Sequence, residues 1–354
     1  LIVTKDPQYP SLLIYPGNLW KEISNSFEKL SGLNPKLRAL QWNFLGNAHQ
    51  IDFEASERMN ILFPQSLREY AHLKEKQKNL LIYDAINKVL NKNKICAPKL
   101  YKENYNNGYL EIEDFGNDTV HKIFKDKNKN KISHFIRIIK VLNQIQSIKN
   151  RSIKNFKNKK YTIPTYDNKI LINEANLFTE WYVKKKLSKV KKIKFENRFK
   201  KIIKKLTLNL KLKNNVFVHR DFHVSNLMLM DKKIGVIDSQ DALIGNKAYD
   251  LASLIDDVRL KTSISLKDKI YNAYTKRQKK LDKEKFKNDF EILSILRNLK
   301  IIGIFTRLAI RDHKKNYLKL IPYAWTLINM RINRNKIFQE LKTLLSENFR
   351  KKIK

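Results

Sequence analysis

The sequence predicts an α+β protein of two lobes, a small N-terminal lobe of antiparallel strands and a mostly helical C-terminal lobe. Three observations lead to this prediction. The chain has 354 residues, which is too long for one minimal domain and enough for two lobes around a cleft. Short alternating apolar segments gather before residue 115, whereas helical periodicity dominates after Ser133.

The first 91 residues combine strand-like and helical patterns. Apolar and polar residues alternate between 38 and 64, where Gly46-Asn47 provides a turn, and this predicts two or three short antiparallel strands. Residues 66–91 have helical periodicity. The apolar side chains that share one face of this predicted helix are Leu80, Tyr83, Ile86, Val89 and Leu90. We expect the helix to pack on the strands.

Two further strands are predicted at residues 99–101 and 109–113, with the turn-forming Asn106-Asn107-Gly108 between them. A short polar connection at residues 114–117 then ends the strand pattern. Because a small sheet that ends in such a connection precedes a long helical region, we place a lobe boundary near residue 115. The predicted lobes are therefore residues 1–115 and 116–354.

Helices account for most of the predicted C-terminal lobe. They are expected at residues 136–148, 173–187 and 195–210, and in a series from 248 to the C-terminus. Three segments there look like strands, namely 216–218, 226–230 and 234–237. All three flank the polar residues that matter most for function.

The charge balance is strongly basic, since 73 basic and 34 acidic side chains give a formal net charge of +39. Such a field attracts polyanions. The lysines are scattered among Asn and Ile residues, however, and no recognisable groove-reading module accompanies them. We therefore predict non-specific attraction to nucleic acid and no specific nucleic-acid partner.

Cysteine usage and hydropathy indicate the compartment. The single cysteine, Cys96, excludes an internal disulfide framework, as expected in a reducing environment. No stretch approaches the about 18 uninterrupted apolar residues of a membrane span, and residues 1–11 lack the apolar core of a signal peptide. The sequence predicts a cytoplasmic protein without a membrane partner, and it gives no indication of the oligomeric state.

A motif with a chemical meaning begins after the strand at 216–218. His219-Arg220-Asp221 is followed five residues after the aspartate by Asn226, and Asp238 ends the apolar strand at 234–237. Phosphoryl transfer needs one carboxylate beside the acceptor hydroxyl and hard oxygen ligands for magnesium at the nucleotide phosphates. We predict that Asp221 accepts or orients the hydroxyl proton, and that Asn226 and Asp238 bind Mg²⁺ that bridges the phosphates of ATP.

Several residues of this segment have a structural role as an alternative to a catalytic one. His219 is consistent with a packed histidine bonded to backbone, and Arg220 with a partner for a nearby carboxylate. Asp250 opens a predicted helix, where we favour a structural role as a capping acid. His219 and His223 lack a third histidine or cysteine at ligand spacing, which argues against zinc.

The same motif is the catalytic-loop and metal-loop signature of protein-kinase-like enzymes, so the predicted two lobes are of the protein-kinase-like fold. A protein kinase typically has a lysine two residues after the catalytic aspartate and D-F-G at the metal site. Here those places hold His223 and Asp238-Ser239-Gln240. Only eleven positions separate Asp238 from Tyr249, too few for an activation segment. The chain thus resembles the aminoglycoside phosphotransferase and choline kinase group, which phosphorylates small hydroxylated molecules.

Further segments narrow the resemblance. Residues 217–228, 235–242, 177–182 and 299–318 are similar to bacterial kinases of the anomeric hydroxyl of N-acetylmuramate and N-acetylglucosamine in cell-wall recycling, and roughly residues 80–340 are covered. This resemblance implies an amino-sugar substrate. The candidate contacts are Trp181 by stacking on a sugar face, Arg307 and Arg311 by pairing with a carboxylate, and Gln240 and Asp241 by binding hydroxyls. Helix packing and surface charge remain the alternatives for Trp181 and the arginines.

The resemblance fails in about the first 78 residues. No glycine-rich phosphate loop is identifiable there, since Gly46 stands alone in the strand region, and no strand lysine is present at residues 59–63. The resemblance places the adenine of ATP against Glu113 and Phe115, in an N-terminal nucleotide-binding lobe. Three alternatives stay open. They are an inactive kinase-like protein that binds nucleotide or sugar, another aminoglycoside- or choline-type kinase, and a protein kinase or nucleic-acid-associated kinase.

Overall fold

The computed structural model describes residues 65–125, 131–230 and 233–353, so the strands predicted for residues 38–64 lie outside the described residues. The chain forms two compact units. Among the described residues, the first unit holds 65–85, Lys99–Asp114 and Lys154–Lys159, and the second holds Ile86–Pro98, Phe115–Ile153 and the residues from Lys160 onward. The predicted division into residues 1–115 and 116–354 stays a prediction.

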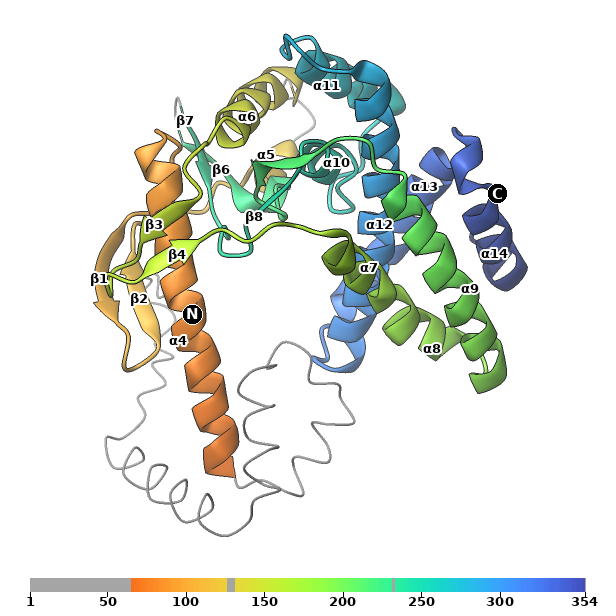
Figure 1. The fold of residues 1–354 in the computed structure, drawn as a ribbon, viewed down its shortest axis with the longest axis horizontal. Helices are drawn as coiled ribbons and strands as arrows, with labels where there is room; N and C mark the ends of the chain where they lie inside the picture. The colour runs from red at the N-terminus through yellow and green to blue at the C-terminus, as the bar shows by residue number, and fades with distance from the viewer. Residues whose placement is uncertain (1–64, 126–130, 231–232, 354) are drawn as a thin grey trace. The chain divides into compact units, whose positions relative to one another are not determined.

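The described part of the first unit consists of a long helix and a hairpin (Figure 1). Helix α4 (Gln65–Lys92) agrees with the helix predicted at 66–91, and its last turns belong to the second unit. Strands β1 (Leu100–Asn104) and β2 (Tyr109–Ile112) pair antiparallel and confirm the predicted hairpin. Gly108 has φ +74° at the turn, a conformation that glycine adopts without strain. The Gln77 amide donates to the Tyr105 carbonyl at 3.1 Å, which joins the helix to the hairpin.

The second unit contains three short two-stranded sheets. Strand β3 (Ser152–Lys154) pairs with β4 (Lys160–Thr162), β5 (Asn214–Val218) with β8 (Leu243–Asn246), and β6 (Leu227–Met230) with β7 (Lys233–Val236). The last two pairs are antiparallel. The strands predicted at 216–218, 226–230 and 234–237 correspond to β5, β6 and β7. Sequence patterns did not predict β3, β4 and β8. Strands β3 and β4 have three residues each and no apolar run, and Gly245 and Asn246 interrupt the apolar pattern of β8.

Helices make up most of the second unit. Its α-helices are α5 (Val120–Phe124), α6 (Lys131–Gln146), α7 (Asn168–Leu177), α8 (Lys184–Lys186), α9 (Lys189–Leu208), α10 (Tyr249–Ile255), α11 (Ile264–Thr275), α12 (Lys283–Ile310), α13 (Ile321–Ile332) and α14 (Gln339–Phe349). Shorter turns are the π-helical η2 (Phe178–Val183) and the 3₁₀ turns η3 (Val224–Asn226), η4 (Lys315–Leu320) and η5 (Lys336–Phe338). Asp167 and Asp282 start α7 and α12 as N-caps, since each carboxylate accepts from the N–H three residues on.

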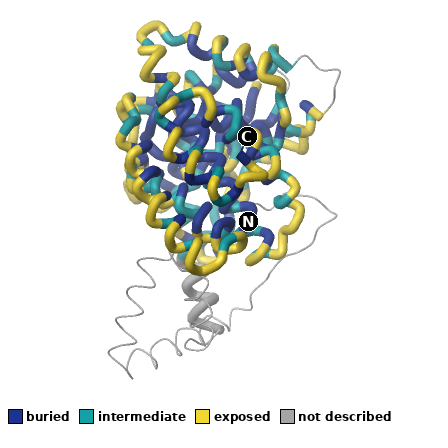
Figure 2. Tube along the Cα trace, turned by 90° about the vertical axis from the view of Figure 1, so that its right-hand side faces the viewer, coloured by how far each residue is buried: buried dark blue, intermediate teal, exposed yellow. Residues whose placement is uncertain are grey.

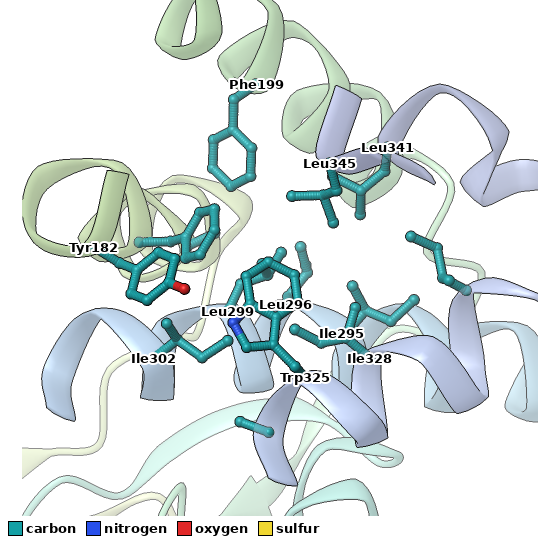
Figure 3. Packing of buried hydrophobic residues seen from close by; sticks show 14 of the residues in the cluster. Tyr182, Phe199, Ile295, Leu296, Leu299, Ile302, Trp325, Ile328, Leu341 and Leu345 are labelled. Atoms are coloured by element: carbon teal, nitrogen blue, oxygen red, sulfur yellow. The ribbon is translucent and has the colours of Figure 1, made fainter. Parts of the chain in front are cut away.

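The main hydrophobic core of the second unit lies where α7, η2, α9, α12, α13 and α14 meet (Figure 3). Aromatic rings fill its centre. Phe178 stacks on Tyr182 at 5.4 Å between ring centroids and meets Trp325 edge-on at 5.8 Å. Along α12, every residue from Asp289 to Leu299 is buried, so this helix runs through the interior of the unit. Figure 2 shows the buried residues of the described chain in dark blue and the exposed ones in yellow.

One glycine sets how closely α12 packs against the end of α7. A Cβ atom at Gly303 would lie 2.3 Å from the carbonyl carbon and oxygen of Leu177. Backbone cannot move aside as a flexible side chain can, so this position requires glycine. Among the described residues, no helix is long and apolar enough to cross a membrane.

Candidate active site

The predicted catalytic loop leaves the end of β5 and is held by a buried carboxylate of α10. Val218 pairs with Leu243 of β8, and the next residue, His219, is fully buried. The Asp250 side chain accepts from the backbone N–H of His219 at 2.7 Å and of Arg220 at 3.0 Å. Asp250 therefore fixes the entry to the loop, which is more than the capping role favoured from the sequence. Arg220 has φ +71°, a strained conformation that these hydrogen bonds help to maintain.

The β6–β7 hairpin brings Asn226 and Asp238 together. Leu227 pairs with Val236, so the residues just before β6 and just after β7 lie side by side. The Asn226 amide donates to the Asp221 carbonyl at 3.1 Å and to the Asp238 carboxylate at 3.2 Å. The three residues predicted from the motif thus meet at one point, although Asp221 and Asp238 are seventeen positions apart in the sequence.

The oxygen atoms at this point suit magnesium. Asp238 is exposed and has φ +62°, which directs the chain away from β7. The Gln240 amide donates to the other oxygen of Asp238 at 2.7 Å. Magnesium is usually held by one or two protein carboxylates together with substrate phosphates and water. One exposed carboxylate beside one amide oxygen fits that pattern, and the Asn226 and Asp238 side chains would hold the ion.

The Asp221 carboxyl is ionised at neutral pH. Burial alone would raise its pKa, but the ammonium of Lys300 and other nearby positive charges lower the pKa to about 2. A carboxylate in this state accepts a hydrogen bond from a hydroxyl group, as an acceptor-orienting residue must. The geometry is consistent with the role that the motif predicts for Asp221.

A second buried carboxylate, Glu174 of α7, organises the charges next to the loop. One oxygen of Glu174 accepts from Arg220 and from Lys300, the latter at 2.7 Å, while the other oxygen accepts from the Tyr166 hydroxyl. Arg220 also donates to the Asp241 carbonyl at 3.2 Å. The prediction that Arg220 pairs with a carboxylate is therefore confirmed, and its main partner is Glu174.

The residue that replaces the protein-kinase lysine is a neutral histidine. His223 is buried, and burial together with the positive charge of Arg259 lowers its pKa to about 3. Its backbone N–H donates to the Asp221 carbonyl at 3.0 Å. Asp257 supports the loop from behind, because its carboxylate accepts from the backbone N–H of Val224 at 3.3 Å. His223 therefore brings no positive charge to the catalytic loop.

The predicted substrate contacts occupy two places in the second unit. Gln240 and Asp241 follow Asp238 directly, and Asp241 is exposed. Trp181 is half-buried on η2, which packs against α12. Arg307 lies on α12, where burial and the charge of Arg311 lower its pKa. Arg311 is exposed and pairs with Asp312 at 2.7 Å. The structure therefore favours the alternative in which Arg311 is a surface charge.

The two predicted adenine contacts belong to different units. Glu113 lies in the first unit, where its backbone N–H donates to the Lys99 carbonyl at 2.8 Å and its carboxylate accepts from the Lys99 N–H at 3.3 Å. Phe115 lies in the second unit against β7, since a Cβ atom at Gly235 would come within 2.7 Å of its ring. The assignment of both residues to adenine stays a prediction.

Sequence reasoning missed two residues next to the loop, Glu174 and Lys300. Glu174 lies on α7 and Lys300 on α12, two helices that pack against each other. Arg297 and Lys300 stand three positions apart on α12, and Arg307 follows seven positions later, so all three share one face. That spacing was readable in the sequence, but nothing in it tied the face to Asp221.

Comparisons with known proteins give two separate results. Residues 71–285 match the phosphotransferase enzyme family. The N-acetylmuramate/N-acetylglucosamine kinase of Neisseria meningitidis serogroup B is 29% identical over 234 residues, 64% of this chain and 68% of that protein. A solved structure of a choline/ethanolamine kinase family protein from Mesorhizobium loti superposes with a TM-score of 0.51 at 10% identity, covering 77% of this chain and 83% of that one. The superposition supports the predicted fold class.

The second result concerns a different protein. The transcriptional regulator MraZ of Alkalilimnicola ehrlichii is 38% identical over 76 residues, which are 22% of this chain and 49% of the regulator. This chain therefore spans about half the length of that relative. The match to the phosphotransferase enzyme family begins at residue 71, and the preceding residues lie outside it.

Proposed function

The chain belongs to the phosphotransferase enzyme family, and we propose that it moves the γ-phosphoryl group of ATP to the anomeric hydroxyl of an amino sugar, N-acetylmuramate or N-acetylglucosamine. The predicted resemblance to aminoglycoside phosphotransferase-like kinases and the prediction of a small-molecule kinase are confirmed by the family and by relatives with kinase names. The observation that carries the proposal is the meeting of Asp221, Asn226 and Asp238 at one point. The named relatives support the choice of sugar, and cell-wall recycling in the cytoplasm is the setting that we infer.

In this mechanism the protein mainly positions the reacting groups. The Asp221 carboxylate accepts a hydrogen bond from the sugar hydroxyl and then its proton. Asn226 and Asp238 would hold magnesium, which neutralises charge on the phosphates of ATP when it is bound. Asp250 keeps the loop in place through the backbone N–H groups of His219 and Arg220.

The sugar itself would lie between Asp221 and the helices of the second unit. We assign Trp181 to stacking on a sugar face and Arg307 to a substrate carboxylate, because both belong to elements that pack together there. Gln240 and Asp241 follow the metal ligand and are placed for sugar hydroxyls. Arg311 extends the same helix and is the weaker candidate, since it already pairs with Asp312.

Turnover tests this function directly. Purified protein is incubated with ATP, magnesium and either sugar, and the sugar 1-phosphate is measured. Aminoglycosides and choline serve as alternative acceptors, and product from one of them alone would replace the amino-sugar assignment. Absence of turnover on every acceptor, combined with sugar or nucleotide binding, would support the inactive kinase-like alternative.

A second function is proposed for the residues before the family match. The family match leaves residues 1–70 and 286–354 outside it, and residues 299–318 carry the sugar-kinase resemblance. We therefore assign most of the 76 residues similar to the MraZ regulator to the N-terminal end. We propose that this segment serves the regulation of transcription. Sequence-selective DNA binding that persists at raised salt would support it. Binding that disappears with salt and shows no sequence preference would leave only attraction by the net charge of +39.

A further inference from the structure

The predicted catalytic loop has no lysine at the position where protein kinases carry one. That position, two residues after the catalytic aspartate, holds the buried His223 in this chain. The phosphoryl group carries developing charge on its oxygen atoms during transfer, and a cation beside it lowers the barrier. The second unit supplies a cation to this place from another element.

Lys300 of α12 is held next to the loop by Glu174. Its ammonium donates to a Glu174 oxygen at 2.7 Å, and the same oxygen accepts from Arg220, the neighbour of Asp221 in the chain. Both the Lys300 and Glu174 side chains retain 12% exposure. The ammonium is thus fixed beside the predicted point of transfer and remains accessible.

Lys300 and Arg220 are held by different sets of neighbours. Arg220 uses its guanidinium on Glu174 and on the Asp241 carbonyl, and it lies over the Tyr166 ring at 5.6 Å. An ammonium has three N–H donors. Within the described residues, Glu174 is the one hydrogen-bond acceptor of Lys300, which leaves donors for oxygen atoms that enter the site.

We propose that Lys300 is a catalytic residue whose ammonium contacts the phosphoryl group as it passes to the acceptor held by Asp221. This inference rests on the proposed function. The bond between the γ-phosphorus and the bridging oxygen of ATP breaks, and a bond from phosphorus to the sugar oxygen forms. Asp221 takes the hydroxyl proton, ADP leaves, and Lys300 keeps its proton while donating to the phosphoryl oxygens.

Lys300→Ala tests the role, with Lys267→Ala as the matched control. Lys267 is also a buried lysine paired with a carboxylate, Asp256, at 3.2 Å. We expect Lys300→Ala to lower kcat about 10²–10³-fold, the usual cost of removing one transition-state donor. Small primary amines added to the solution should restore part of that activity. Lys267→Ala should lower Tm, leave kcat per folded molecule unchanged and show no amine rescue.

Equilibrium binding provides a readout without turnover. Lys300→Met should weaken binding of magnesium-ATP about tenfold relative to magnesium-ADP, because only ATP carries the group that Lys300 contacts. An unchanged ATP to ADP affinity ratio together with absent amine rescue would overturn the inference. Wild-type turnover decides the proposed function separately. If the wild type makes no sugar phosphate, the ratio of ATP to ADP affinity alone tests the role of Lys300. If the wild type binds neither nucleotide, the proposed role of Lys300 is wrong.

Discussion

Two buried carboxylates of the second unit have the same kinds of partners and different surroundings. Each is bound by one arginine, one lysine and one hydroxyl group. The partners of Glu174 are Arg220, Lys300 and Tyr166. The partners of Asp256 are Arg331, Lys267 and Ser294. The side chains of the Glu174 ion network keep 12–19% exposure, whereas those of the Asp256 ion network keep 0–6%.

The comparison indicates that residue chemistry alone does not separate a structural ion network from one that we propose to take part in catalysis. In both networks burial opposes the charge on the carboxyl, and the paired cations outweigh it and lower the pKa. The Asp256 network is buried, so its charges act only on neighbouring residues of the fold. The Glu174 network adjoins Asp221 and retains access, so its cations can act on a substrate.

We expect the largest effect from replacing the proposed base, Asp221, which adjoins the Glu174 network. Asp221→Asn keeps the size of the side chain but cannot accept the hydroxyl proton, so kcat should fall about 10²–10⁴-fold. Nucleotide affinity and Tm should remain close to wild type, and steady-state kinetics with calorimetry measure all three. Full activity in this variant would show that another group is the base.

We expect the next largest effects from replacing the central carboxylate of each network. Asp256→Ala leaves the buried cations Arg331 and Lys267 without their carboxylate and should cost about 3–5 kcal/mol of unfolding free energy. kcat per folded molecule should not change. Glu174→Ala should lose less stability, because its cations are more exposed, and should lower kcat as well. Denaturant titration and kinetics on both variants sharpen the comparison, and equal kinetic losses would contradict it.

We expect a smaller effect from a substitution that disturbs helix packing near the Glu174 network only. Gly303→Ala puts a methyl group against the Leu177 backbone at the end of α7, the helix that carries Glu174. Overpacking of this kind costs about 1–3 kcal/mol, and the better helix propensity of alanine offsets about 1 kcal/mol of it. We expect a lower Tm and a lower kcat, since α7 must shift relative to Lys300. An unchanged Tm would mean that α7 accommodates the methyl group freely.

The smallest effect is a dependence of stability on pH. Burial raises the pKa of Asp250 to about 7, although its backbone hydrogen bonds oppose the shift. A carboxyl with a raised pKa in the folded state stabilises the fold most below its unfolded value near 4, and this contribution is lost as pH rises through 7. Wild type should therefore lose about 2 kcal/mol between pH 5 and 7, by the linkage of about 1.4 kcal/mol per unit.

Asp250→Asn is the matched variant, because asparagine does not titrate. Its pH dependence over the same window should be flatter than that of the wild type. Urea unfolding at pH 5 and pH 7 measures the difference. An equally steep decline in the variant would assign the dependence to other groups.

Local sequence was sufficient to predict the structure and the candidate site where neighbouring residues define both. The turn Asn106-Asn107-Gly108 predicted the β1–β2 hairpin, and short apolar segments predicted β6 and β7 around the proposed metal ligands. The spacing of Asp221, Asn226 and Asp238 predicted that they meet, because a hairpin returns the chain to its starting point. The structural role of Asp250 was foreseen, but its contact with the catalytic loop was not.

The sequence by itself therefore determined the family, the catalytic motif and most helices, since each depends on residues within a few turns or one hairpin. Tertiary structure alone decided that Lys300 and Glu174 stand beside Asp221. Lys300 lies 79 positions after Asp221, and it reaches the loop only because α12 packs against α7 at Gly303. No local pattern distinguishes such a lysine from Lys267, which differs from it in the carboxylate it meets and in its exposure.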